Sequence, residues 1–152
     1  MNHSENINEI AGALAKAQAK IKNATKESEN PFFHSRYADL ASVWDACREP
    51  LAENGIAVVQ SPEYVPDTNM VVLETMLTHS SGQWMASQLT GIPVKEVNET
   101  VDGQKVRKEV ESRTPQAIGS CITYLRRYAL AAFVGVAPED DDGNVASISV
   151  PS

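Results

Sequence analysis

Residues 114–135 carry the start, the body and the end of one helix in their sequence, and they therefore fix which face must be buried. Thr114 is a helix-capping residue, Pro115 occupies the first helical position, and Gly135 stands where the helix should stop. At about 100° per residue, apolar side chains gather on one face, which we expect to lie on a sheet. That face consists of Ile118, Ile122, Leu125, Ala129 and Ala132.

The opposite face of this helix is polar and carries no acid. It consists of Gln116, Ser120, Thr123 and Arg127, with Tyr124 beside it and Arg126 toward its other flank. An arginine fork with short hydroxyl and amide donors suits a phosphate backbone, and Gly119 permits close approach. The alternative is a solvated face, with Gly119 serving tight helix packing. We expect Arg127 to be exposed, and Arg126, nearer the apolar edge, to pair with an acid such as one of residues 139–142.

Two further helices are predicted upstream. Residues 4 to about 24 form an amphipathic pattern with Ser4 as a plausible N-cap, and their apolar stripe is a candidate contact with a neighbouring copy of the chain. The second helix covers residues 39–54, with Asp39 as its N-cap. Pro50 lies inside this second pattern and should kink or split its last turn.

Three strands are predicted between these helices and residue 114. They cover residues 56–60, 70–79 and 83–94, and residues 80–82 (Ser-Ser-Gly) connect the last two as a hairpin. Polar residues alternate with apolar ones, so that only one face of the sheet needs to be buried. The predicted fold class is therefore α+β, an antiparallel β-meander of about three or more strands backed by helices in the order αα-βββ-α.

Residues 95–113 differ from their surroundings, because they contain five basic and five acidic residues, no aromatic residue and a central Asp102-Gly103 turn signal. This segment is predicted to be a protruding hairpin or a mobile loop. Residues 1–145 are expected to form one domain, followed by a short tail over residues 146–152.

Two other regions offer groups for a polyanion. Lys16 and Lys20 project from the first helix, either as a solvated face or as an edge that contacts phosphates. The loop over residues 32–37 mixes aromatic residues with His34 and Arg36. Such a loop can stack bases and hold phosphate, or it can be anchored in the core by its phenylalanines.

Charge does not exclude a polyanion partner, although the net charge is −7. Four of the 20 acids stand together at residues 139–142, whereas residues 112–138 contain three arginines and no acid. The acidic run is a solvated turn or an interaction tail, or it holds Mg²⁺ with its hard oxygen ligands. Cys47 and Cys121 fall on apolar helix faces and are expected to be reduced core thiols.

Signals for catalysis or a membrane are weak. The sequence has no Gly-x-x-x-x-Gly-Lys motif for ATP, no His-Cys cluster at zinc spacing, and three isolated histidines. No apolar run approaches the roughly 20 residues that span a bilayer, and the N-terminus is polar. We therefore expect a cytosolic protein with no catalytic residue and no resident metal.

The motifs resemble a known family. "NPFFHSRYADLASVWDACREPLAENGIAVVQ" followed by "TPQAIGSCITYLRRYALAAFVGVAPEDDDGN" is similar to the ERF (essential recombination function) family of phage single-strand DNA annealing proteins. The resemblance extends from about Glu5 to Asn144. Family members typically have a lysine at the position of His34, and the charged 95–113 segment resembles a variable region.

The resemblance implies ATP-independent binding of single-stranded DNA and annealing of complementary strands by a homo-oligomeric ring or helical filament. It implies a fold similar to the ring-forming eukaryotic annealing proteins, no covalent chemistry, no required cofactor with Mg²⁺ possible, and the host cytoplasm as location. A host single-strand-binding protein or a phage exonuclease is a possible partner. The alternatives are an Mg²⁺-dependent nuclease that uses residues 140–142 and an oligomeric protein-interaction scaffold.

Overall fold

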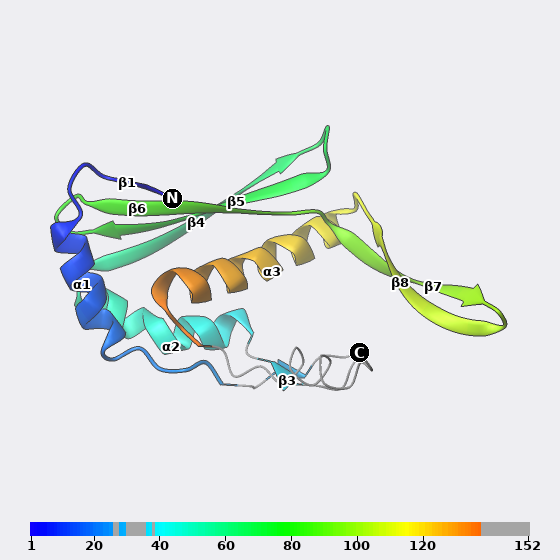
Figure 1. The fold of residues 1–152 in the computed structure, drawn as a ribbon, viewed down its shortest axis with the longest axis horizontal. Helices are drawn as coiled ribbons and strands as arrows, with labels where there is room; N and C mark the ends of the chain where they lie inside the picture. The colour runs from blue at the N-terminus through cyan, green and yellow to red at the C-terminus, as the bar shows by residue number, and fades with distance from the viewer. Residues whose placement is uncertain (26–27, 30–35, 38, 138–152) are drawn as a thin grey trace.

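The computed structural model describes residues 1–25, 28–29, 36–37 and 39–137, and its element order confirms the α+β class (Figure 1). The predicted αα-βββ-α core is present, with short strands added before and between the first helices and a further hairpin before the last helix. In chain order the elements are β1 (Asn2–His3), α1 (Asn8–Gln18), β2 (Ser28–Glu29), β3 (Arg36–Tyr37), α2 (Leu40–Glu53), β4 (Ile56–Val65), β5 (Met70–His79), β6 (Trp84–Gly91), β7 (Val94–Val101), β8 (Gln104–Glu111) and α3 (Pro115–Val134).

The central sheet is antiparallel, with the strand order β1-β6-β5-β4. β5 has the predicted bounds, and the predicted hairpin connects it to β6, with Gly82 in the left-handed region at φ 90°. β4 is longer than predicted because it continues through Pro62 to Val65. A proline lacks the N–H that a second neighbouring strand would need, and β4 tolerates it because it is an edge strand of this sheet.

The sheet is covered on one face, where Figure 1 shows all three helices. Every second residue of β5 points toward them and is buried: Val71, Leu73, Thr75 and Leu77. On the other face, Val59 of β4 is 52% exposed. The alternation therefore follows the pattern expected for a sheet with one solvated side.

The first helix is shorter than predicted, because α1 begins at Asn8 rather than after Ser4. Ser4 is not its N-cap: its backbone N–H donates to the Trp84 carbonyl (2.9 Å), and its hydroxyl accepts from the Trp84 N–H (3.0 Å). Residues 2–3 pair with β6 instead of turning into the helix. The apolar stripe packs within the chain: Ile10 and Ala17 are fully buried, and Ile7, Leu14 and Ile21 are partly buried against the same core.

The second helix has the predicted start, and it contains Pro50 without ending there. Asp39 caps α2 by accepting from the Ser42 N–H at 2.8 Å. Pro50 does not split the helix, which runs unbroken to Glu53. Because Pro50 has no N–H, the Ala46 carbonyl loses its partner inside the helix, and the Lys22 N–H donates to that carbonyl instead, at 3.3 Å.

The last helix has the predicted ends. The Thr114 hydroxyl accepts from the Ala117 N–H at 3.1 Å, and Gly135 closes α3 in the left-handed region at φ 84°. Its predicted apolar face lies on Val71 and Leu73 of the sheet, except for Ala132, which is exposed.

The two halves of α3 have different neighbours. The C-terminal half also packs on α1 and α2, through Leu130, Ala131 and Val134. In the N-terminal half, α3 crosses close to β6, because a Cβ atom at Gly91 would lie 3.1 Å from the Cys121 Sγ atom.

Candidate nucleic-acid interface

A groove of about 850 Å³ lies between the N-terminal half of α3 and the base of the β7–β8 hairpin. Figure 1 shows the hairpin extending away from the sheet beside that end of α3. The charged 95–113 segment thus forms a hairpin, with Asp102 and Gly103 both at positive φ in its turn. The groove is lined by Val94, Lys95, Glu96, Asn98, Arg107, Glu109, Thr114, Gln116, Ala117, Ser120 and Tyr124.

Part of the predicted polar face of α3 lies in this groove. Gln116, Ser120 and Tyr124 line it, and Tyr124 is 61% exposed. Thr123 is exposed as well, but its hydroxyl donates to the Gly119 carbonyl at 3.2 Å, which leaves the hydroxyl oxygen only as an acceptor. Gly119 has open space around it, so tight helix packing does not explain its presence.

The hairpin contributes groove residues that the sequence analysis did not single out. Asn98 and Arg107 pair in the strand register and face the helix across the groove, whereas Lys95, which also lines the groove, pairs with Val110 and belongs to the opposite face of the hairpin. The Asp102-Gly103 turn signal contained part of this information, because a two-residue turn at that point sets the same register. The turn signal does not indicate which helix the hairpin faces.

The groove combines positive and negative groups. Its two cations, Lys95 and Arg107, are matched by Glu96 and Glu109, and the Arg107 Nη1 atom lies 4.0 Å from the Glu96 Oε2 atom. α3 also begins here: Thr114, Gln116 and Ala117 line the groove, and the first turn of the helix contains no acid. A helix N-terminus carries partial positive charge, which favours an anion at this end of the groove, although Pro115 has no N–H and the Ala117 N–H already donates to the Thr114 hydroxyl.

Arg127 is not in the groove, which corrects the prediction that it is exposed. Its relative exposure is 8%, and its guanidinium lies 4.7 Å from the centre of the Tyr128 ring. The helical period places Arg127 on the same stripe as Leu130, Ala131 and Val134, which pack on α1 and α2. The side of α3 that faces away from the sheet is therefore buried at Arg127, although it is exposed to solvent earlier in the helix, at Ser120 and Thr123.

Arg126 contacts the sheet through the side-chain amide of Gln60. Its Nε atom donates to the Gln60 Oε1 atom at 3.4 Å, and the Gln60 Nε2 atom donates to the Arg126 carbonyl at 3.1 Å. Gln60 also donates to the buried Thr75 hydroxyl at 3.1 Å. Arg126 thus joins α3 to β4 and β5, and the acids at 139–142 lie outside the described residues.

Two other predicted phosphate contacts, Lys16 and Lys20, do not line this groove. Lys16 lies on α1, which is at the opposite end of the molecule from the hairpin in Figure 1, and Lys20 lies in the turn after α1, with its Nζ atom 3.7 Å from the Glu53 Oε2 atom. Arg36 belongs to β3, whose backbone pairs with β2. His34 lies outside the described residues.

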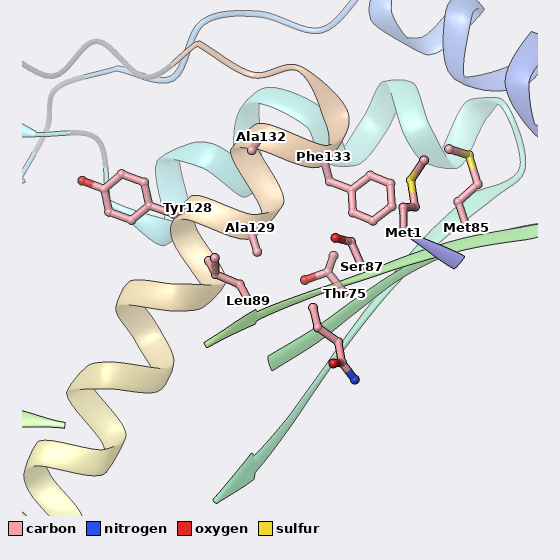
Figure 2. Close-up of a pocket in the computed structure, with 10 residues that line it drawn as sticks. Met1, Thr75, Met85, Ser87, Leu89, Tyr128, Ala129, Ala132 and Phe133 are labelled. Carbon is pink, nitrogen blue, oxygen red and sulfur yellow. The ribbon is translucent and has the colours of Figure 1, made fainter. Parts of the chain in front are cut away.

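A second cavity, of about 560 Å³, lies between β6 and the C-terminal half of α3 (Figure 2). The side chains that line it are apolar or uncharged. Tyr128 stands at one end of it, with its ring directed away from Phe133 and Met1. The cavity is lined by Met1, Thr75, Met85, Ser87, Gln88, Leu89, Tyr128, Ala129, Ala132 and Phe133.

Both cysteines are free thiols. Burial raises the pKa of Cys47 to about 11, so its thiol is neutral and a poor nucleophile at physiological pH. Within residues 1–25, 28–29, 36–37 and 39–137, no three His, Cys, Asp or Glu side chains gather as a metal site. Among the helices that the structure describes, none has both the length and the apolarity to cross a membrane.

The fold and the groove define an α+β protein whose candidate site is a polar binding groove between a helix and a hairpin. The chain belongs to the ERF superfamily, whose family model matches residues 10–149. This membership supports a role in phage recombination or DNA annealing. Comparisons with curated proteins and with solved structures gave no significant match.

Proposed function

We propose that this protein binds single-stranded DNA and anneals complementary strands without ATP, as a homo-oligomer in phage-type homologous recombination. The observation that carries the proposal is the groove, in which the first turn of α3 and short donors lie opposite Arg107. Donors of this kind suit phosphate oxygens, whereas a conventional base-reading motif is absent from the sequence. Binding should therefore depend little on DNA sequence.

The mechanism that fits this groove is physical. A strand held by its phosphates is extended, and its base edges stay available to a complementary strand. A contact from Arg107 reduces the repulsion between two phosphate backbones. Base pairing then supplies the free energy that drives the product, and the step requires no nucleophile and no nucleotide hydrolysis.

The test is an annealing assay with two complementary, differently labelled oligonucleotides, without ATP and either with Mg²⁺ or with a chelator. We expect the protein to speed duplex formation under both conditions and to leave strand lengths unchanged. Shortened strands that appear only with Mg²⁺ would instead indicate a nuclease. Failure to bind either strand at low salt would support a protein-interaction scaffold.

Oligomerisation forms part of the proposal, and exposed valines on the hairpin support it. Val101 and Val106 are 47% and 45% exposed, and the strand register places them on the same hairpin face as Val97 and Val110. Such a stripe is available to a second copy of the chain. We expect light scattering at micromolar concentration to give a multiple of 16.5 kDa. A monomeric mass with and without DNA would contradict this part.

Gly119 allows a separate test of whether a DNA phosphate approaches the backbone of α3 closely. A Cβ atom at Gly119 would meet no atom of this chain within 4 Å, and the same holds for Gly12 in α1. Either Gly→Ala change should raise the free energy of unfolding by about 0.5–1 kcal/mol, because alanine favours a helix. Only Gly119→Ala should weaken DNA binding, severalfold, since its methyl group would separate a phosphate from the helix. Urea unfolding and DNA titration measure the two effects, and equal affinities of the two variants would argue against close approach.

A further inference from the structure

Two tyrosines stand next to each other on the surface of α3. Tyr124 and Tyr128 are one helical turn apart, their ring centres lie 4.6 Å apart, and the planes are tilted by 48°. They are 61% and 41% exposed. Aromatic rings of this size are usually buried, and an exposed pair is more typical of a binding surface.

The pair lies at the end of the polar groove. Tyr124 lines the groove together with Ser120 and Arg107, and Tyr128 continues the same side of α3 toward the apolar cavity. A strand that runs along α3 from the groove would therefore meet Tyr124 first and Tyr128 next. Figure 2 shows the Tyr128 ring turned outward from the cavity, with its hydroxyl at the far end.

The Tyr128 ring has a fixed support. The guanidinium of Arg127 lies 4.7 Å from its centre, and Arg127 is itself buried. A cation over an aromatic face attracts the ring, and a buried arginine has little freedom to move. Burial and the neighbouring Tyr128 raise the pKa of Tyr124 above its usual range, so Tyr124 is uncharged at neutral pH and does not repel phosphate.

We propose that Tyr124 and Tyr128 form a stacking site for unpaired nucleobases of the strand whose phosphates lie in the groove. The inference rests on the proposed function, and the occupant follows from the neighbourhood: aromatic faces next to Lys95, Arg107 and the N-terminus of α3 match a molecule with bases and phosphates. Every base has an aromatic face, so stacking adds affinity without sequence preference.

Stacking also suits annealing better than insertion into a cavity. A base held by its face keeps its pairing edge free, whereas a base inside the apolar cavity next to Tyr128 would have that edge covered. Bases in a duplex already stack on one another, so the site should favour the single strand and release it once pairing is complete. The tyrosines would thus hold the reactant and not the product.

The experiment compares oligothymidine with an abasic oligonucleotide of equal length and charge. Wild-type protein should bind oligothymidine about tenfold more tightly or better, because stacking contributes on that scale for each base. The double variant Tyr124→Leu/Tyr128→Leu should lose this preference and still bind both strands with the wild-type salt dependence. The matched control, Tyr124→Phe/Tyr128→Phe, keeps the rings and should keep the preference.

The other outcomes separate stacking from competing explanations. Equal binding of the two strands by wild type, or a preference retained by the leucine variant, would overturn the proposal. Loss of the preference in the phenylalanine variant would assign the contact to the hydroxyls instead. A leucine variant of reduced mass by light scattering, with its strand preference intact, would make the pair a contact between copies. Failure of wild type to bind either strand refutes the proposed function itself.

A fluorescence readout does not depend on the leucine variant folding. An oligonucleotide that contains 2-aminopurine should change in fluorescence on binding to wild-type protein and to the phenylalanine variant, because that base responds to stacking. Binding to either protein with no such change would overturn the stacking assignment.

Discussion

Replacing Arg127 with alanine is expected to lower the free energy of unfolding by about 2–4 kcal/mol, on the scale of large-to-small changes at buried positions. Its exposure is 8%, and its guanidinium packs over the Tyr128 ring. Truncation removes a long side chain from the stripe that continues into the core through Leu130 and Val134. Thermal melting should show a fall of several degrees, since about 1 kcal/mol corresponds to about 2–4 °C for a chain of this size.

Two controls separate packing from charge and from position on the helix. Arg127→Met keeps most of the side-chain length and should recover part of the lost stability if packing dominates. Gln116→Ala changes an exposed residue of the same helix and should alter stability by less than about 0.5 kcal/mol. A normally stable Arg127→Ala protein that no longer binds DNA would contradict the structural role and restore a direct phosphate contact.

Helix ends were predictable where their signals are local. Asp39 and Thr114 each cap a helix by accepting from an N–H three residues later, and Gly135 adopts the left-handed conformation that ends α3. Ser4 carried the same kind of signal and misled the prediction, because its partner is Trp84, 80 residues away. Ser4 can either cap a helix or pair with a strand, and the sequence around Ser4 does not show that β6 lies beside it.

The error at Arg127 has a similar cause. Helical periodicity separates two faces correctly when a helix has one packed neighbour. The N-terminal half of α3 satisfies that condition, and there Gln116, Ser120 and Tyr124 are exposed as predicted. The C-terminal half packs on the sheet and on α1 and α2, so a second face is buried and the pattern no longer identifies the solvated side.

Only one wall of the groove could be predicted from the sequence. The helical wall followed from the periodicity of α3. For residues 95–113, the charge pattern and the Asp102-Gly103 signal predicted either a hairpin or a loop and did not decide between them. Which hairpin face turns toward α3 depends on the exit of the chain from β6 near Gly91 and on the packing of that glycine against Cys121. Those contacts join residues that are distant in sequence, and neither segment specifies them alone.

The largest effect on DNA binding is expected from the cations of the groove. Arg107→Ala should weaken binding of single-stranded DNA about tenfold or more, because hydrogen bonds to charged groups are among the strongest that a side chain makes. The slope of log affinity against log salt should become shallower by about 0.7, since a protein with one phosphate contact fewer releases fewer counterions when it binds. Titrations at several salt concentrations measure both quantities.

Lys108→Ala is the matched control. Lys108 is adjacent to Arg107 on β8 and has the same charge, but the register places it on the opposite hairpin face, where its Nζ atom lies 3.5 Å from the Glu99 Oε2 atom. Its loss should leave the salt slope unchanged. Equal effects of the two variants would mean that DNA responds to the overall charge of the hairpin and that the groove has no special role.

The carboxylates of the groove give a prediction of opposite sign. Glu109 lines the groove beside the hairpin cations, and its negative charge repels a phosphate there. Glu109→Gln keeps the size of the side chain and removes that charge, so it should tighten DNA binding, most clearly at low salt.

Opposite effects of Arg107→Ala and Glu109→Gln, with none from Lys108→Ala, are the result expected for a phosphate that lies within the groove. Weaker binding by Glu109→Gln would instead mean that this carboxylate positions the groove cations, and the strand would then have to lie elsewhere on the hairpin.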